Sequence, residues 1–419
     1  MSTDTAIDAR RAIEALRAGV PNRDAVRALG CDQPEIEERF RQLLAAARQD
    51  PAPASGLLVQ GDFGTGKSHL LAYLERVALD GGFVCSRVVI SKETPLYDPV
   101  RVARATLRGS VVPGRRGPGI RELAALLQPE SEGYAALEAW AQDRDQGLNP
   151  RFPVSLSLFR RMGVASEAGD RVVSFWSGEP LGAGEVKRYL RACGDRPTGR
   201  LESATQRDLA LQRLRFAPRL ARAAGLAGWV LLLDEVELIG SYSVLQRGRS
   251  YAELARWLGK VRSEPLAGLC TVLAIMSNYE TEVLERKGDL ETVAERLRCK
   301  GQGEAARWAE QGMRALRRDR LRLHLPSLES LLRVHDTVRR LHGQAHGWQP
   351  PAGRPESRLS STALREHIRS WINDWDLQRL YPGYRPGTVV RSDEVRRTYE
   401  EDADLEAPAD DGSPDPQDA

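Results

Sequence analysis

The spacing of hydrophobic residues along this 419-residue chain changes several times, and each change marks a different kind of predicted element. Four short apolar runs, near residues 56–60, 82–91, 228–234 and 268–278, have the length and continuity of buried parallel strands. The segments around them repeat apolar residues every three or four positions, which predicts amphipathic helices. Strands that alternate with helices in this way predict an α/β fold on a parallel sheet.

The order of these elements divides the chain into four predicted parts. A helical segment occupies residues 1–50, an α/β core residues 51–320, a helical lid residues 321–399 and an acidic tail residues 400–419. Inside the core, roughly 135 residues separate the second strand from the third, far more than one crossover needs. We therefore predict a helical insertion at about 112–200.

Composition favours a soluble protein and leaves the partner open. Hydrophobic residues make up 41%, no apolar run is long enough to span a membrane, and no signal peptide precedes the first helix, so we expect a cytoplasmic protein. Five scattered cysteines predict reduced thiols. The net charge of +3 hides a tail with nine acidic and no basic residues, which predicts disorder and leaves the rest of the chain at +12. A basic body is compatible with duplex DNA, but 55 of the 61 basic residues are arginine, which a GC-rich genome would also produce.

The stretch GDFGTGKS, residues 61–68, supplies the most specific chemical signal. It matches G-x-x-x-x-G-K-[ST], a loop whose backbone N–H groups surround the phosphates of a nucleotide. Lys67 is expected to contact the β- and γ-phosphates, and the Ser68 hydroxyl is expected to bind Mg²⁺. The predicted ATP-binding residues are Gly61, Asp62, Phe63, Gly64, Thr65, Gly66, Lys67, Ser68 and His69.

A second nucleotide-site motif, VLLLDEVE, ends the third predicted strand. Asp234 and Glu235 follow four apolar residues, at the carboxyl edge where open α/β sheets bind ligands. We predict that Asp234 holds Mg²⁺ and that Glu235 is the catalytic base that orients the attacking water. Glu237 is the alternative base; Glu235 is preferred because it directly follows the metal-binding aspartate.

Two further catalytic candidates come after the fourth strand. Asn278, or alternatively Ser277, ends that strand and is predicted to contact the γ-phosphate or the water. Arg296, with Arg298 as the alternative, is the candidate for a positive charge supplied to a neighbouring subunit of a homo-oligomer.

These motifs together resemble the AAA+ branch of P-loop ATPases. Three stretches are more specifically similar to ATP-binding proteins of BREX bacteriophage-exclusion systems, of the BrxD type. They are ARRAIEALRAGVPNRDAVRALG, GDFGTGKSHLL and VVISKETPLYDP. The resemblance implies an AAA+ fold with strand order 5-1-4-3-2, a C-terminal helical lid, ATP hydrolysis, and other BREX defence proteins as partners in a DNA-associated antiphage complex. A lid of this kind would present a sensor arginine, for which Arg385, Arg391 and Arg396 are candidates.

Two other functions stay open at this point. An origin-recognition-like loader would share core and lid, although such loaders usually append a winged helix. A nucleotide-gated scaffold would bind ATP with little turnover. Two remaining clusters carry weaker signals: His335, His342 and His346 share a helical face but lack a full set of metal ligands, and the basic run at 314–323 is expected to be a solvated helix face.

Overall fold

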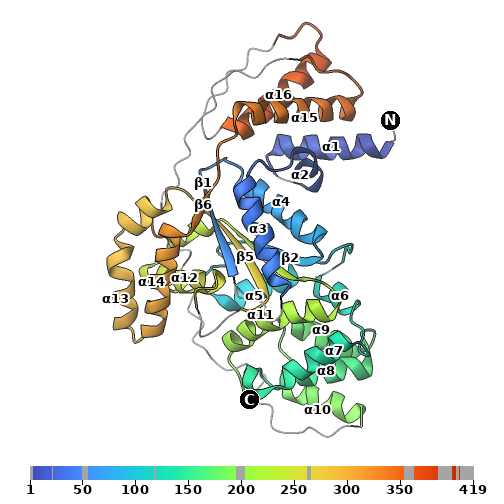
Figure 1. The fold of residues 1–419 in the computed structure, drawn as a ribbon, viewed down its shortest axis with the longest axis vertical. Coiled ribbons are helices and arrows are strands. Elements are labelled where there is room, and N and C mark those ends of the chain that lie inside the picture. The colour runs from blue at the N-terminus through green and yellow to red at the C-terminus, as the bar shows by residue number, and fades with distance from the viewer. Residues whose placement is uncertain are drawn as a thin grey trace.

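A six-stranded sheet with helices on both faces forms the centre of the protein (Figure 1). The computed structural model describes residues 3–20, 22–49, 55–117, 119–194, 203–261, 266–352, 363–385, 399–402 and 405. The strands are β1 (Ser55–Gly61), β2 (Phe83–Val89), β3 (Ser110–Val111), β4 (Gly228–Asp234), β5 (Leu269–Met276) and β6 (Arg320–Arg322).

The sheet order is β3-β2-β4-β5-β1-β6. It differs from the predicted five-strand order because a sixth strand is present: the short β3 pairs antiparallel with β2 through Cys85 and Ser86. All other pairings are parallel, so the remaining strands run β6-β1-β5-β4-β2 across the sheet. The prediction of only helices beyond residue 320 missed β6. Its three residues, Arg-Leu-Arg, carry too little hydrophobic pattern to mark a strand, although Leu321 packs against the core.

Alternate residues of the central strands face two separate hydrophobic clusters. Val230 and Leu232 of β4 pack with α3 (Pro34–Ala47) and α4 (Lys67–Asp80), while Leu231 and Leu233 point to the opposite face. That face is covered by α5 (Pro99–Arg108), α11 (Gln206–Ala223) and α12 (Val244–Trp257). A strand buried on both faces must be apolar throughout, as the run VLLL is.

Beside the β6 edge lie three helices, α12 with α13 (Asp289–Cys299) and α14 (Gly303–Arg318). Two short helical turns precede them: η2 (Val236–Ser241), directly after β4, and the π-helix η3 (Glu280–Glu285), directly after β5. Both turns begin at the carboxyl edge of the sheet.

In the described residues the predicted insertion contains five α-helices and one 3₁₀ turn, and it lies at one end of the molecule (Figure 1). Their aromatic residues meet α11 in one cluster, in which the Trp176 ring lies 5.1 Å from Phe159 and 5.8 Å from Phe216. The insertion therefore shares its core with the rest of the protein rather than standing apart. Its elements are α6 (Gly119–Ala124), α7 (Glu132–Gln142), η1 (Arg144–Gln146), α8 (Arg151–Met162), α9 (Glu167–Trp176) and α10 (Ala183–Ala192).

The N-terminal helices and two helices from residues 328–380 build a second helical unit at the opposite end of the molecule (Figure 1). Helices α1 (Thr3–Ala18) and α2 (Arg23–Leu29) pack against α15 (Leu328–His346) and α16 (Ala363–Leu380), with Ile13 and Ile372 fully buried between them. We call these four helices the terminal helical body. Gln33 and His324, which lie in the two connections to the core, bond to each other twice: Gln33 Nε2 donates to His324 O (2.8 Å), and His324 N donates to Gln33 Oε1 (2.9 Å).

The start of the predicted disordered tail contacts the core, which corrects that prediction for its first residues. Asp402 N donates to Ser241 O (3.0 Å), and Tyr97 Oη donates to Leu405 O (3.3 Å). Residues 399–402 and Leu405, here called the C-terminal segment, thus lie along η2. Residues 406–419 lie outside the described residues.

Candidate nucleotide-binding site

The phosphate loop connects the central strand β1 to α4. Gly64 and Gly66 have φ angles of 78° and 99°, which an L side chain rarely adopts. A Cβ at Gly61 would come within 2.6 Å of Thr65 Oγ1, whose hydroxyl bonds to Asp62 O (2.8 Å). Three glycines are therefore needed for the loop to bend over the N-terminus of α4, where free N–H groups attract anions.

Lys67 lies at the centre of the site. Its Nζ donates to Gly61 O (3.0 Å) and Asp62 O (3.2 Å) and lies 2.9 Å from Met276 Sδ on β5. Burial lowers the pKa of Lys67, while the neighbouring carboxylates of Glu237, Asp234, Asp62 and Glu235 act in the opposite direction. The lysine is therefore a partly desolvated cation among acids, and added phosphates would favour its charged form.

Asp234 and Glu235 take up different environments although they are adjacent. Asp234 is buried (3% exposed) and accepts from Arg87 Nη2 of β2 at 3.0 Å. Glu235 is exposed, and with φ 56° it is the one non-glycine residue with positive φ in the described part of the chain. Such strain persists where the surrounding structure holds it, often at functional sites. The sequence did not single out Arg87; its only signal was a charged residue inside a predicted buried strand.

Glu237, the alternative base, is buried in η2 with 4% exposure. It is the carboxylate with the largest effect on the pKa of Lys67. The structure therefore places both Glu235 and Glu237 close enough to Lys67 to influence its charge. They differ in that Glu235 is open to solvent.

The end of β5 brings Ser277 and Asn278 to the same edge. Gln60 of β1 donates through Nε2 to Ser277 O (2.8 Å), which ties this turn to the strand before the phosphate loop. The Asn278 side chain accepts a hydrogen bond from Tyr399 Oη at 3.1 Å. Tyr399 belongs to the C-terminal segment, and nothing in the sequence indicated this contact.

The remaining predicted ATP-binding residues differ in what their side chains do. Ser68 is half-buried at the start of α4, and Phe63 is 44% exposed in the loop. His69 is turned to the N-terminal helices, where its Nε2 lies 2.8 Å from Gly30 O, and burial lowers its pKa. The His69 side chain is therefore engaged in packing, and only its backbone faces the loop.

The candidate arginines whose side chains are described lie on the surface. Arg296 and Arg298 are exposed on α13, and the Arg298 guanidinium is bonded to Glu310. Arg385 is exposed, and Arg391 and Arg396 lie outside the described residues.

The residues present fit a nucleotide with Mg²⁺. The loop contains a concave glycine backbone that a Cβ at position 61 would obstruct, and a lysine faces it. The Ser68 hydroxyl and the Asp234 carboxylate are oxygen donors, the kind that Mg²⁺ prefers.

The histidine cluster in the terminal helical body does not fit a metal. His342, His346 and Asp376 place ligand atoms within 4.8 Å of one another. However, Trp348 Nε1 donates to His342 Nδ1 (2.9 Å), so the proton lies on His342 Nε2, which faces Asp376 Oδ1 at 3.2 Å. Arg17 and Arg379 also bond to Asp376. Its charge is therefore already compensated, and the cluster joins α1, α15 and α16.

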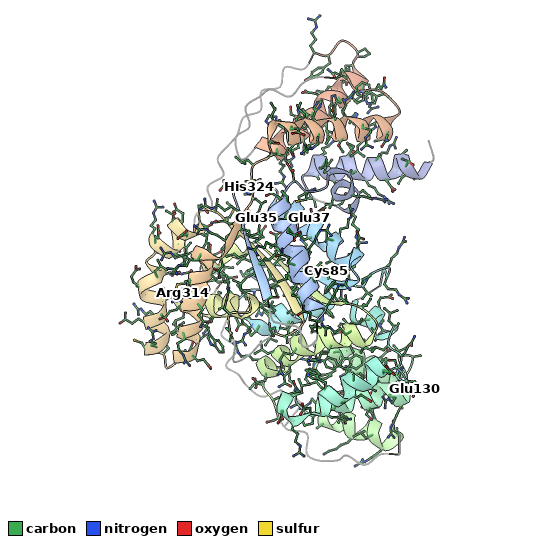
Figure 2. The ribbon with its side chains drawn as sticks, in the orientation of Figure 1. Glu35, Glu37, Cys85, Glu130, Arg314 and His324 are labelled. Atoms are coloured by element: carbon green, nitrogen blue, oxygen red, sulfur yellow. The ribbon has the colours of Figure 1, made fainter. Side chains whose placement is uncertain are left out.

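The basic run 314–323 is divided between α14 and β6, and two of its arginines are paired. Arg317 and Arg320 both bond to Glu280. Arg314 lies on α14, on the opposite side of the sheet from Glu130 in the insertion (Figure 2). The pairing weakens the case for a free basic face along this run.

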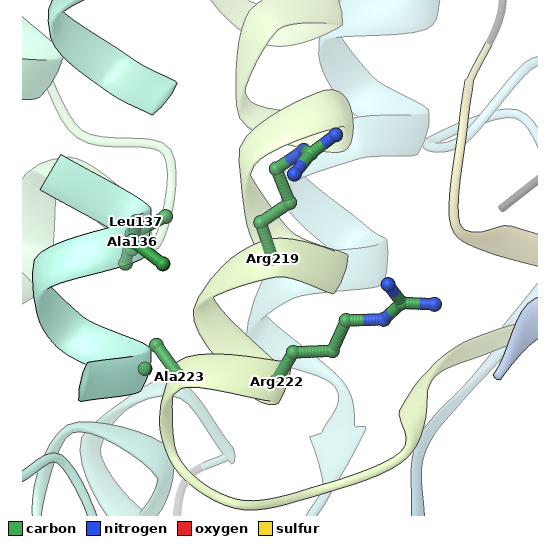
Figure 3. Close-up of a pocket in the computed structure, with 6 residues that line it drawn as sticks. Ala136, Leu137, Arg219, Arg222 and Ala223 are labelled. Atoms are coloured by element: carbon green, nitrogen blue, oxygen red, sulfur yellow. The ribbon is translucent and has the colours of Figure 1, made fainter. Parts of the chain in front are cut away.

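A cavity of about 140 Å³ lies between α7 and α11, and none of the residues that line it belongs to the phosphate loop (Figure 3). Two arginines of α11 line it. Arg219 stacks on Trp140 at 4.5 Å, and Arg222 Nη2 donates to Gln49 O at 2.6 Å. Both are used in packing. Among the described residues, no helix combines the length and the apolar character needed to cross a membrane.

Comparison with known proteins identifies the family. A family model described as BREX system ATP-binding protein BrxC/D matches residues 6–108 and 195–381, which is most of the chain. The unmatched stretch between them contains β3 and the helices α6 to α10. No curated protein matches the chain. The phosphate loop, Asp234 and nearly all of the terminal helical body lie in the matched residues, and the chain belongs to the family of BREX system ATP-binding proteins BrxC/D.

Proposed function

We propose that this protein is a Mg²⁺-dependent ATPase of the AAA+ type that drives or switches a DNA-associated complex of a BREX bacteriophage-defence system. The observation that carries the proposal is the convergence of Lys67 with the carboxylates of Asp234, Glu235 and Glu237 at the carboxyl edge of the sheet. Counted without β3, the strand order β6-β1-β5-β4-β2 corresponds to 5-1-4-3-2, which supports the AAA+ type.

Residues of this chain are proposed to bind ATP and to orient the water that attacks its γ-phosphate. The loop N–H groups and Lys67 hold the phosphates, and Lys67 exchanges its two backbone carbonyl partners for phosphate oxygens. Bound Mg²⁺, held by Ser68 and Asp234, would neutralise charge on the phosphates. Glu235 orients the attacking water, since it is solvent-open and next to Asp234, while Asn278 contacts the γ-phosphate side.

Arg87 gives the Asp234 carboxylate a counter-charge. A buried carboxylate without a counter-charge would be costly, and the 3.0 Å pair with Arg87 offsets that cost. Binding of Mg²⁺ would then require Asp234 to turn from the guanidinium to the metal.

Variants of Lys67 and Glu235 test the proposal. Lys67→Ala should weaken ATP binding by at least about tenfold, because it removes the cation that faces the phosphates. Glu235→Gln should bind ATP like the unmodified protein but hydrolyse it on the order of 10² to 10⁴ times more slowly. Lys300→Ala, at an exposed position after α13, is the matched control and should change neither value.

Fluorescent-ATP titration and a phosphate-release assay measure the two steps separately. If Glu235→Gln hydrolyses ATP at the normal rate and Glu237→Gln does not, the catalytic base is Glu237. If the unmodified protein binds ATP but releases no phosphate, alone or with duplex DNA, it is a nucleotide-gated scaffold.

Assembly and DNA contact form the remaining part of the proposal. We expect ATP to promote a homo-oligomer in which Arg296 reaches a neighbouring site, so Arg296→Ala should lower activity, whereas Arg298→Ala, whose guanidinium is bonded to Glu310 in its own chain, should not. Binding to a labelled duplex, by anisotropy at two salt concentrations, should weaken steeply with salt if arginines contact phosphates. If ATPase activity per subunit does not change with protein concentration, Arg296 does not complete the site of a neighbouring subunit.

A further inference from the structure

The C-terminal segment reaches the nucleotide site from outside the part of the chain that matches the family. The match ends at residue 381, whereas Tyr399 lies against the turn after β5. Tyr399 is 6% exposed, and its ring meets Tyr279 edge-on at 5.7 Å. A Cβ at Gly240 would collide with the Tyr399 ring, so the ring fills a space that this glycine leaves.

The hydroxyl of Tyr399 determines how the Asn278 amide is turned. Tyr399 Oη donates to Asn278 Oδ1 at 3.1 Å, and the oxygen and nitrogen of an amide lie on opposite sides of its carbon. The donor group Nδ2 is therefore held on the side away from Tyr399. Asn278 follows Met276, whose Sδ is 2.9 Å from Lys67 Nζ, by two residues. Because Oδ1 accepts from Tyr399, Nδ2 is the group that Asn278 can offer to a phosphate.

Further contacts hold the C-terminal segment in place beside the site. Arg247, which is 2% exposed, donates to Glu401 Oε1 (2.8 Å) and to both carboxylate oxygens of Asp289. Tyr251 Oη donates to Asp289 (2.6 Å) and lies 2.9 Å from Tyr279 Oη. This network runs from the exposed Glu401 through the buried Arg247, Asp289 and Tyr251 to Tyr279, the residue after Asn278. The segment is therefore joined to the same turn twice, through Tyr399 and through Arg247.

We propose that Tyr399 is a positioning residue for Asn278, through which the C-terminal segment controls the rate of ATP hydrolysis. This inference rests on the proposed ATPase function. Tyr399 does not contact the reacting groups; it fixes the amide that does. The π-helix η3 starts two residues after Asn278, so an irregular helical turn follows directly on the residue whose amide Tyr399 holds.

The test compares steady-state ATP hydrolysis by Tyr399→Phe with that by the unmodified full-length protein. Removing one hydrogen bond that orients a catalytic group should lower kcat about three- to tenfold, with KM and fluorescent-ATP affinity unchanged. Tyr384→Phe removes the same atom from a tyrosine bonded to Asp374 in the terminal helical body and should leave kcat unchanged. Thermal unfolding of Tyr399→Phe should match that of the unmodified protein to within a few degrees.

Coupling to Asn278 separates positioning from a general structural effect. In the Asn278→Ala background, which is itself slow, Tyr399→Phe should cause no additional loss, because both changes remove the same oriented donor. Truncation after residue 405 should leave kcat unchanged, whereas truncation after residue 398 should lower it as Tyr399→Phe does.

Three outcomes would overturn the inference. They are normal kcat in Tyr399→Phe, an undiminished loss in the Asn278→Ala background, or an equal loss in Tyr384→Phe. Absence of hydrolysis by the unmodified protein is a different result, since it removes the proposed ATPase function and this inference with it.

Discussion

Acidification should loosen the terminal helical body through His342. The side chain is fully buried between α15 and α16, faced by Asp376, His346 and Arg379, and burial lowers its pKa from 6.5 to about 4. Between these values the unfolded chain binds more protons than the folded one. The free energy of unfolding therefore falls as the pH drops from about 6.5 towards 4.

The size of the effect follows from the two pKa values. Relative to its value above pH 6.5, the free energy of unfolding is lower by about 2 kcal/mol at pH 5. Below pH 4 the decrease approaches about 3 kcal/mol. Above pH 6.5 His342 is neutral in both the folded and the unfolded chain, and the free energy of unfolding has its full value. A loss of about 2 kcal/mol raises the population of an opened state roughly thirtyfold. The neighbouring His346, whose pKa burial also lowers, should act in the same direction.

Hydrogen exchange of α15 peptides, corrected for the intrinsic pH dependence of exchange, measures the local opening free energy at pH 7 and pH 5. His342→Gln keeps polar atoms for Trp348 and Asp376 but cannot take up a proton, so its profile should be flatter by about 2 kcal/mol. His324→Gln, at an exposed histidine (66% of the side chain), is the control and should keep the full pH dependence. Parallel profiles for His342→Gln and the unmodified protein would refute the reasoning.

Three further changes test other parts of the structure. Gly61→Val should abolish ATP binding, because even a Cβ there would come within 2.6 Å of Thr65 Oγ1; ATP titration measures this, and normal affinity would show that the loop can shift. Trp176→Ala should destabilise the insertion by about 3–5 kcal/mol in urea unfolding while ATP binding persists, and loss of binding would mean that the insertion supports the phosphate loop. Arg87→Gln should lower the Mg²⁺ concentration for half-maximal hydrolysis, because it frees Asp234 from a competing cation; an increase would mean that the arginine orients the carboxylate for the metal.

Local sequence signals were sufficient for the phosphate loop and for the strands that carry it. The run before Gly61 and the run before Asp234 are apolar because their strands are buried on both faces, and the loop motif requires glycines for its backbone. These features depend on near neighbours in the chain. The insertion was predicted from the distance between two strands, which exceeds what one crossover needs.

The features that the sequence did not reveal depend on residues far apart in the chain. The pair of Arg87 with Asp234 spans 147 positions, and the bond of Tyr399 to Asn278 spans 121. The acidic composition after residue 400 predicts disorder, but composition cannot show that Glu401 meets a buried arginine. Strand β6 was missed because it forms from three residues by pairing with β1 rather than by its own pattern.

The double hydrogen bond between Gln33 and His324 has a mechanical consequence. Two of the covalent connections between the terminal helical body and the core, one before α3 and one after β6, are bonded to each other by this amide, and a third leads from α16 to the C-terminal segment. Gln33 therefore couples these two segments, so that a displacement of the segment before α3 is transmitted directly to the segment after β6.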